Sequence, residues 1–185
     1  MSINLNELPA CLQPYKTQII ATKKDSIEIS LVPTEDLQIW QSKVGGNPYL
    51  PVGKQYPQSA EGDDLQLLAQ INFAEVPENQ HYPKSGILQF FINPHDDLYG
   101  LNFDDQKKQD GFRVVFYDKI EQDLALLQSD FPSFAEDDIY SPIAGQSAIQ
   151  FEKAESYIDM NNFDFAQKVT DPYERDDEEE FCDEY

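Results

Sequence analysis

Five side chains that could bind a metal ion lie close together in the stretch NPHDDLYGLNFDD, Asn93 to Asp105. They are one imidazole and four carboxylates, those of His95, Asp96, Asp97, Asp104 and Asp105. Oxygen-rich sets of this kind suit magnesium, calcium or manganese. The stretch is not an EF-hand, because the glycine and the terminal glutamate of that loop are missing. The favoured interpretation is a turn in which Asn93, Asp96 and Asp104 cap backbone N–H groups, with a divalent-cation site as the alternative.

A second stretch, SKVGGNPYLPVGKQYP from Ser42 to Pro57, places a lysine just before a Gly-Gly pair. A phosphate-binding loop needs G-x-x-x-x-G-K followed by Ser or Thr on a strand-to-helix turn, and this stretch has neither the spacing nor the hydroxyl. Its glycines allow positive φ, whereas its prolines fix φ and remove backbone donors. The stretch is therefore interpreted as a fixed scaffold with Lys43 as a surface charge. The alternative is a ligand-binding nest formed by Lys43, Gly45 and Gly46.

Three amide side chains lie within otherwise apolar segments. They are Gln70 and Asn72 in LLAQINF and Gln89 in GILQFF. A buried amide without a partner costs about 1–3 kcal/mol, so each must find hydrogen-bond partners. Mutual hydrogen bonding that fixes the register of two strands is the favoured interpretation, and a polar ligand pocket is the alternative.

Nucleophilic catalysis has little support in the sequence. The segment AGQSA around Ser147 lacks the glycines of the G-x-S-x-G turn, and His81 and His95 are the only histidines available as a base. Cys182 lies among carboxylates, which raise the pKa of a thiol and lower its reactivity. The sequence therefore favours a protein that is not an enzyme, and no cofactor is predicted apart from the divalent cation considered above.

The charge balance narrows the range of partners. The chain has 13 Lys and Arg against 35 Asp and Glu, a formal net charge of -22. Nucleic acid and anionic membrane surfaces repel such a protein, so neither is expected as a partner. Most of the excess lies in the last third of the chain. A basic protein is the partner that this charge would attract, and the alternative is that the acidity only keeps the protein soluble.

Cysteine usage and the N-terminal residues indicate a cytoplasmic protein. Cys11 and Cys182 are far apart and give no support to a disulfide framework or a zinc site, which suits a reducing compartment. The first residues, MSINLNELPACLQPY, have neither a basic region nor an apolar leader. No stretch approaches the roughly 18 continuous apolar residues of a membrane-spanning helix.

Hydrophobic periodicity predicts the elements that position these residues. A helix is expected over residues 8–24, starting or straightening after Pro14, and a short helix within residues 120–131. Alternation and β-branched content predict strands over residues 26–32, 65–73, 86–92, 112–117 and 147–151, the first of them half-buried. We expect residues 1–155 to form a single domain and residues 156–185 a weakly structured acidic tail, to which Phe163, Phe165 and Phe181 could add docking contacts.

Five blocks of sequence carry a resemblance to a known family. They are SKVGGNPYLP, LLAQINFAEVP, YPKSGILQFFI, HDDLYGLNFDD and FRVVFYDKI, in this order between Ser42 and Ile120. Together they resemble the YwqG-like family of bacterial proteins of unknown function. The resemblance implies an α+β fold, mainly antiparallel β-sheet with a few flanking helices and an acidic C-terminal tail. It implies no catalytic residues.

The chain departs from this family in one respect. YwqG-like relatives continue into a second unit with a Gly-Gly-Tyr loop and a Trp-Gly-Asp turn, which this sequence lacks, so it resembles a short or truncated member. A sheet built to be completed would have an open edge, and open edges recruit partners or second copies. We therefore expect self-association through a sheet edge or a fold that depends on a partner.

Two functions are consistent with the sequence. The first is a non-enzymatic protein-interaction module that binds a basic partner, with an immunity-type role by analogy to YwqG-like relatives near toxin systems. The second is a metal- or small-molecule-binding enzyme that uses the loop from His95 to Asp105. The first interpretation is favoured, because the ionisable groups show no catalytic spacing.

Overall fold

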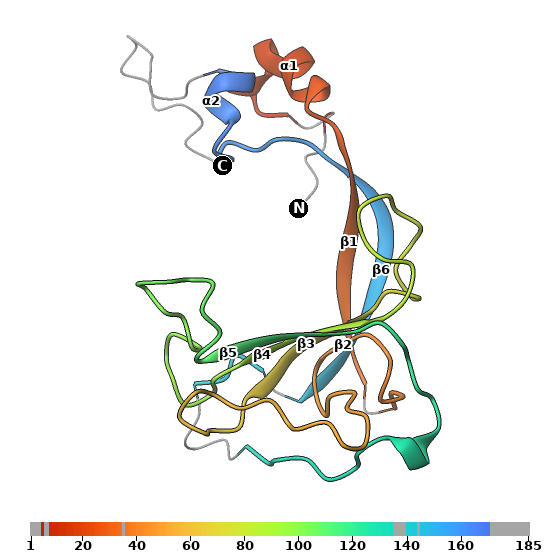
Figure 1. Cartoon of the computed structure of the whole chain (residues 1–185). Helices are drawn as coiled ribbons and strands as arrows, with labels where there is room; N and C mark the ends of the chain where they lie inside the picture. The colour runs from red at the N-terminus through yellow and green to blue at the C-terminus, as the bar shows by residue number, and fades with distance from the viewer. Residues whose placement is uncertain (1–4, 6–7, 35, 135–139, 144, 171–185) are drawn as a thin grey trace. The chain divides into compact units, whose positions relative to one another are not determined.

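A computed structural model of the protein describes residues 5, 8–34, 36–134, 140–143 and 145–170 (Figure 1). Six strands form one sheet in the order β1-β6-β2-β3-β4-β5. The strands are β1 (Lys24–Pro33), β2 (Lys43–Gly45), β3 (Gln66–Asn72), β4 (Ile87–Ile92), β5 (Phe112–Tyr117) and β6 (Gln146–Ser156). The helices are the 3-10 helices η1 (Ala10–Tyr15) and η2 (Leu124–Leu126) and the α-helices α1 (Lys16–Ala21) and α2 (Phe165–Lys168).

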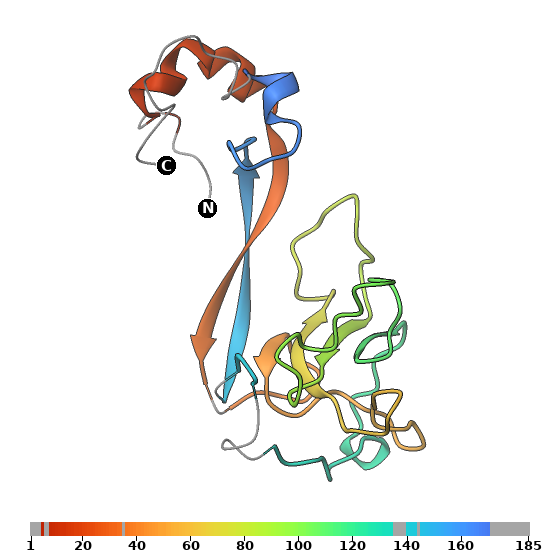
Figure 2. The ribbon, with the colours of Figure 1, turned by 90° about the vertical axis from the view of Figure 1, so that its left-hand side faces the viewer.

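The sheet is mostly antiparallel, as predicted. β2 pairs antiparallel with both β3 and β6, and the pairs β3–β4 and β4–β5 are antiparallel as well. β1 and β6 run side by side as long strands in both ribbon views (Figures 1 and 2). The fold is thus a mostly antiparallel sheet with short helices.

The chain divides into two units, and the boundary falls within β1 and β6. The terminal unit comprises residues 1–28 and 152–185, and the central unit comprises residues 29–151. The sequence predicts instead one domain over residues 1–155 followed by a tail. The difference arises because residues after 155 pack against the N-terminal helix, as described below.

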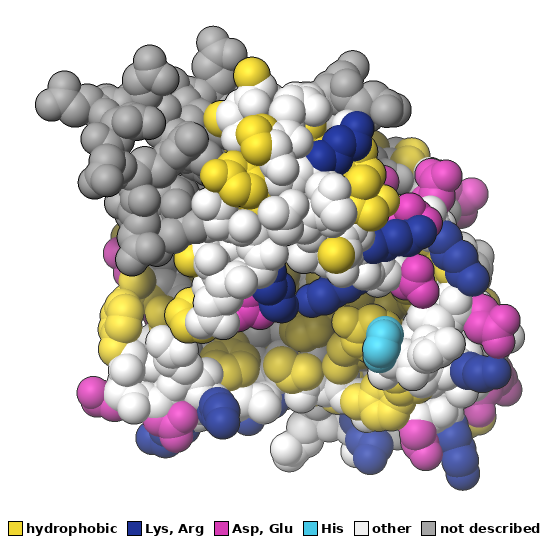
Figure 3. Space-filling model, turned by 90° about the horizontal axis from the view of Figure 1, so that it is seen from above, with side chains coloured by type: hydrophobic (Ala, Val, Ile, Leu, Met, Phe, Trp, Pro, Cys, Tyr) yellow, Lys and Arg dark blue, Asp and Glu magenta, His cyan; other side chains and the backbone are white. Residues whose placement is uncertain are grey.

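The surface carries charged and apolar side chains together. Figure 3 shows acidic and basic side chains interspersed with apolar ones on the face that it presents. No helix in the described part of the chain is long and apolar enough to cross a membrane.

In the central unit, β3 contains a bulge that decides which side chains are buried. Leu67 pairs with Phe91, but Ala69 already pairs with Phe90, so Leu68 is an extra residue on β3. One extra residue reverses the alternation of side chains. As a result Leu67, Gln70 and Asn72 all lie on the buried face. Their partners on β4 are buried too, namely Phe91, Gln89 and Ile87.

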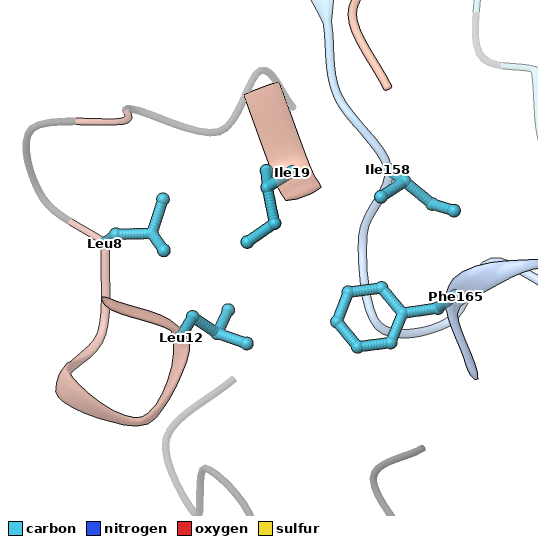
Figure 4. Packing of buried hydrophobic residues seen from close by; sticks show 5 residues of the cluster. All are labelled: Leu8, Leu12, Ile19, Ile158 and Phe165. Carbon is cyan, nitrogen blue, oxygen red and sulfur yellow. The ribbon is translucent and has the colours of Figure 1, made fainter. Parts of the chain in front are cut away.

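The terminal unit has a small apolar core of its own. Leu8, Leu12 and Ile19 from the N-terminal segment pack with Ile158 and Phe165 from the C-terminal segment (Figure 4). The backbone N–H of Ile158 also donates to the Thr22 hydroxyl at 3.0 Å. Phe165 is 1% exposed, so its predicted docking is confirmed. Phe163 is 92% exposed, and Phe181 lies outside the described residues.

The N-terminal helix follows the prediction in part. The chain forms a 3-10 helix through Pro14, which lacks an N–H donor, and becomes α-helical at Lys16. Cys11 is disulfide-bonded, which corrects the expectation from cysteine usage; the other cysteine of the chain, Cys182, lies outside the described residues.

Three features of the secondary structure differ from what the sequence predicted. β1 is exposed over most of its length instead of half-buried. The short strand β2, which was not predicted, lies inside the stretch interpreted as a fixed scaffold. The helix expected within residues 120–131 is a three-residue 3-10 turn, because Leu127 there forms a β-bridge with Pro51 and the Gln128 N–H donates to the Leu50 carbonyl.

Candidate functional site

The three predicted amides form a buried network that ties β3 and β4 to the segment before β3. The Gln70 Oε1 accepts hydrogen bonds from the Tyr49 N–H and from the Gln89 Nε2, each at 2.8 Å. The Gln89 Nε2 also donates to the Tyr49 carbonyl at 2.8 Å. Gln70 and Gln89 are both fully buried. The expected mutual hydrogen bond is therefore present, and Tyr49 is held from both sides.

The same network fixes the chain just before β2. The Gln70 Nε2 donates to the carbonyls of Ile39 and Gln41, each at 2.8 Å. The Asn72 Nδ2 donates to the Trp40 carbonyl at 3.1 Å. Buried backbone carbonyls need hydrogen-bond donors. Here the side-chain amides are those donors, in place of the backbone N–H groups of a paired strand.

The Gly-Gly pair serves the close approach of two backbones. Gly45 and Gly46 have φ of 70° and 69°, a region that favours glycine. A Cβ on Gly45 would lie 2.3 Å from the Gly145 carbonyl oxygen, and one on Gly46 would lie 2.4 Å from the Gln146 Oε1. The glycines therefore let β2 meet β6. This contact accounts for the pair without a bound anion and supports the scaffold interpretation.

Lys43 lies in the interior, which corrects the expectation of a surface charge. Its side chain is 2% exposed, and its Nζ donates to the Ile39 carbonyl at 3.2 Å. Burial lowers the pKa of the amine to about 8, since desolvation disfavours the charged form. No carboxylate forms a salt bridge with Lys43 within the residues that the structure describes. Lys43 pairs with Gln70 on β3 and with Ala148 on β6, residues far from it in the sequence, so the sequence alone did not reveal its surroundings.

The acidic loop is built from successive side-chain caps. The Asp96 carboxylate accepts from the N–H groups of Leu98 and Gly100 at 3.0 and 2.9 Å. The Asn102 Oδ1 accepts from the N–H groups of Asp104 and Asp105 at 2.9 and 3.1 Å. Asn93 caps His95, and Asp105 caps Lys107, in the same way. Capping turns of this kind are what the favoured interpretation predicts, although Asn102 and Asp105 take the place of Asp104.

The loop does not gather its ionisable groups around one point. Across the described ranges, no set of three His, Cys, Asp or Glu side chains is arranged to hold a metal ion. The structure therefore does not bring His95, Asp96, Asp97, Asp104 and Asp105 together as a cation site. Two of these carboxylates instead hold backbone N–H groups.

The loop presents apolar side chains that the sequence reasoning missed. Phe103 is 72% exposed, and Leu98, Tyr99 and Leu101 are between 39% and 44% exposed. They lie between the acidic pair Asp96–Asp97 and the acidic pair Asp104–Asp105. We call residues 96–105 the acidic-aromatic loop. The sequence shows these apolar residues beside the carboxylates, but it does not show that they are exposed.

The loop is also rigidly anchored. Tyr99 has φ of 57°, which is uncommon for a residue with a side chain. A Cβ on Gly100 would lie 1.9 Å from the Gly111 carbonyl oxygen, so two backbone segments touch there. The Asn93 N–H donates to the Tyr99 carbonyl at 3.4 Å. These contacts fix the direction in which the exposed side chains point.

A groove of about 700 Å³ lies elsewhere in the central unit, between the segment after Pro51 and β5. Its charged lining residues are Lys54, Arg113, Lys119 and Asp118. The Arg113 Nη2 donates to the Gln58 carbonyl at 2.8 Å. None of its three cations makes a salt bridge with another described residue. The predicted ligand-binding residues Lys43, Gly45, Gly46, Gln70, Asn72 and Gln89 are not among those that line it.

Comparison with known proteins places the chain in a family. A search of curated proteins found no match. Residues 42–185 match the family described as a domain of unknown function, DUF1963. This range contains β2 to β6, the amide network and the acidic-aromatic loop. Because the match covers most of the sequence, the chain belongs to the DUF1963 family.

Proposed function

We propose that this chain is a non-enzymatic protein-interaction module that binds a basic protein through the acidic-aromatic loop. The observation that carries the proposal is the exposure of Phe103 next to the carboxylates of Asp104 and Asp105, on a loop fixed by its own hydrogen bonds. A cluster of exposed apolar side chains on a folded surface marks a site of contact, whereas an exposed side chain that stands alone does not. The carboxylates next to Phe103 favour a partner with positive charge.

The loop has the chemistry of an interface centre. Large side chains such as Phe103 and Tyr99 contribute much of the binding energy in protein complexes when a partner removes them from water. The capping bonds of Asp96 and Asn102 hold the loop before binding, so little conformational entropy is lost on association. A preformed loop of this kind suits a rigid docking site.

Electrostatics favours a basic partner over a neutral one. The chain has 35 acidic against 13 basic residues, and this excess accelerates encounter with a cationic protein. It also supplies specificity, because a partner with acidic groups is repelled. The affinity should therefore fall as the salt concentration rises.

The more specific proposals, a YwqG-like type and an immunity-type role, rest on the five sequence blocks that carry the resemblance. The five blocks between Ser42 and Ile120 support membership of the YwqG-like type within the family. An immunity-type role, in which the chain neutralises a basic toxin, follows by analogy with that type. The charge of the chain supports it.

The test compares binding by the wild-type chain and by Phe103→Ala. The immobilised full-length protein captures partners from a lysate, and the captured basic protein is purified and titrated at low and high salt. We expect Phe103→Ala to weaken binding by about 2 kcal/mol or more. Phe163→Ala, at a phenylalanine that is 92% exposed in the terminal unit, is the matched control and should bind as wild type. Equal affinity of Phe103→Ala and wild type would contradict the proposal.

The second candidate is a metal- or small-molecule-binding enzyme. The groove with Lys54, Arg113 and Lys119 supports an anionic small molecule, because its cations lack salt-bridge partners among the described residues. Thermal unfolding with magnesium, calcium, manganese or inorganic phosphate tests this candidate, since a ligand of the folded state raises Tm. A rise with a cation that disappears in His95→Ala, or a rise with phosphate that disappears in Arg113→Ala, would favour it over the interaction module.

A further inference from the structure

Strand β1 is a long strand at the edge of the sheet, and it is largely exposed. In the sheet order it has β6 on one side and no described strand on the other. Ile29 and Leu31 are 52% and 51% exposed. Long exposed edge strands with apolar side chains are sites at which another strand adds.

The ribbon formed by β1 and β6 has little other support. β2 pairs with β6 only over Gln146, Ser147 and Ala148. Among the described strands, β1 is therefore the neighbour of β6 over its remaining residues. A two-stranded ribbon is marginally stable by itself in water, whereas three or more strands support one another.

The opposite edge of the sheet is partly closed by its own chain. The outward N–H of Val114 on β5 donates to the Gln109 Oε1 at 2.8 Å. The Arg113 side chain bonds the Gln58 carbonyl next to the same strand. Caps of this kind protect an edge from further pairing. The two edges of the sheet thus differ, and β1 is the one left open.

The sequence of β1 is self-complementary in one antiparallel register. With Ile29 opposite Ile29 of a second copy, Ile27 lies opposite Leu31, and all of these side chains share one face. On the other face Glu28 lies opposite Ser30. Apolar pairs across strands stabilise a sheet, and this register contains no pair of like charges.

The neighbouring registers are poorer. Centring the pair on Glu28 places two carboxylates opposite each other. Centring it between Glu28 and Ile29 places Ile29 opposite Glu28 and Leu31 opposite Ser26, so each apolar side chain meets a polar one. Centring it on Ser30 keeps Ile29 opposite Leu31 but places Glu28 opposite Val32. Of these registers, the one centred on Ile29 makes the most apolar pairs.

We infer that a second copy of this chain pairs antiparallel with β1 about a two-fold axis at Ile29, which joins two sheets edge to edge into one. A two-fold contact is closed, so it yields a dimer and not a filament. The local charge does not oppose it, since β1 holds Lys24 as well as Asp25 and Glu28. The acidic-aromatic loop takes no part in the pairing, so this inference and the proposed function can fail separately.

Cysteine cross-linking tests the register. Ile29→Cys should form an interchain disulfide on mild oxidation, because the two-fold axis places residue 29 opposite itself within disulfide reach. Glu28→Cys and Ser30→Cys should each fail to cross-link alone and should cross-link when mixed. Peptide mass spectrometry identifies the linked residues and separates them from links to the native cysteines. Cross-linking of Glu28→Cys with itself would overturn the register.

Light scattering of the full-length protein tests the dimer. We expect a concentration-dependent dimer that becomes tighter as salt screens the net charge of -22. Ile29→Lys should raise the dimer dissociation constant at least about tenfold, since two like charges meet at the axis. Leu98→Lys, at an exposed leucine of the acidic-aromatic loop, is the matched control and should dimerise as wild type. A wild-type monomer at high salt, or an unchanged dimer in Ile29→Lys with wild-type circular dichroism, would overturn the inference.

Discussion

Gln70 on β3 lies directly opposite Gln89 on β4, and the Gln89 Nε2 donates to the Gln70 Oε1 at 2.8 Å inside a core with no exposure at either residue. The same Oε1 accepts from the Tyr49 N–H. One carbonyl oxygen thus joins two strands and the segment that precedes them. Buried amides that share hydrogen bonds in this way favour one packing arrangement, because a shifted arrangement loses these partners. Within the described residues the Gln89 Oε1 is the atom of this pair without a hydrogen-bond partner.

Loss of this oxygen should destabilise the central unit strongly. Gln70→Ala leaves the Tyr49 N–H and the carbonyls of Ile39 and Gln41 without their partners. We expect the free energy of unfolding to fall by about 3 kcal/mol in urea denaturation. Gln55→Ala, at an exposed glutamine of the same central unit, should stay within about 0.5 kcal/mol of wild type. Equal stability of the two variants would show that the network is not structural.

Burial of Lys43 should make stability depend on pH in the alkaline range. Its pKa falls from 10.5 to about 8 in the folded chain. Between these values the unfolded chain holds a proton that the folded chain has lost, so the free energy of unfolding rises with pH, by at most about 1.4 kcal/mol per pH unit. Below pH 8 both states are protonated, and the cost of burying the charge is constant.

Lys43→Met should therefore be more stable than wild type at pH 7, and this advantage should shrink as the pH rises from about 8 toward 10. Urea denaturation at several pH values measures the difference between the two proteins, which cancels the titration of their other groups. Lys54→Met, at an exposed lysine, controls for the loss of one positive charge. Parallel pH profiles for Lys43→Met and wild type would contradict the effect of burial.

The contact between Gly100 and Gly111 should not tolerate a side chain. Gly100→Ala places a Cβ 1.9 Å from the Gly111 carbonyl oxygen, so the acidic-aromatic loop must shift. Gly62 is a matched control, because its φ of 96° is close to the 91° of Gly100 and its Cβ would meet nothing within 4 Å. Gly62→Ala should cost about 1–2 kcal/mol from backbone strain alone. Gly100→Ala should cost roughly 2 kcal/mol more in urea denaturation, and a similar cost for both would refute the close approach.

Two phenylalanines of the terminal unit should behave in opposite ways. Phe165 is 1% exposed and belongs to its core, whereas Phe163 is 92% exposed. Phe165→Ala removes a buried ring, which typically costs about 3–5 kcal/mol. Hydrogen exchange across residues 8–21 should lose its protection in Phe165→Ala and keep it in Phe163→Ala. Protection that survives in Phe165→Ala would mean that the C-terminal segment is not part of this core.

The elements predicted best are those whose own residues decide their structure. The β-branched and aromatic residues of FRVVFY predict a strand over Phe112–Tyr117, which are the bounds of β5. The spacing of Ile120, Leu124 and Leu127 is helical, yet Leu124 is 64% exposed and Leu127 is buried against Tyr49 and Ile87. The β-bridge between Leu127 and Pro51 outweighs the helical propensity of this segment. Periodicity alone could not show that contact.

Some features of the candidate site could likewise be predicted from the sequence, and others could not. Capping by Asp96 and amide pairing of Gln70 with Gln89 follow from residue type, because short polar side chains bind nearby backbone and buried amides need partners. The burial of Lys43 and the exposure of Phe103 depend on which neighbours cover each residue. Neighbours distant in the chain decide both, and a single sequence does not specify them.

The bulge at Leu68 has a consequence for inheritance. Deletion of one codon between Leu67 and Gln70 would remove the bulge and leave these two residues two positions apart, so both would still face the interior opposite Phe91 and Gln89. Deletion of Ile71 would instead make Gln70 and Asn72 adjacent, and one of the two amides would turn away from the interior. Related chains should thus lose a residue at the bulge more readily than at Ile71.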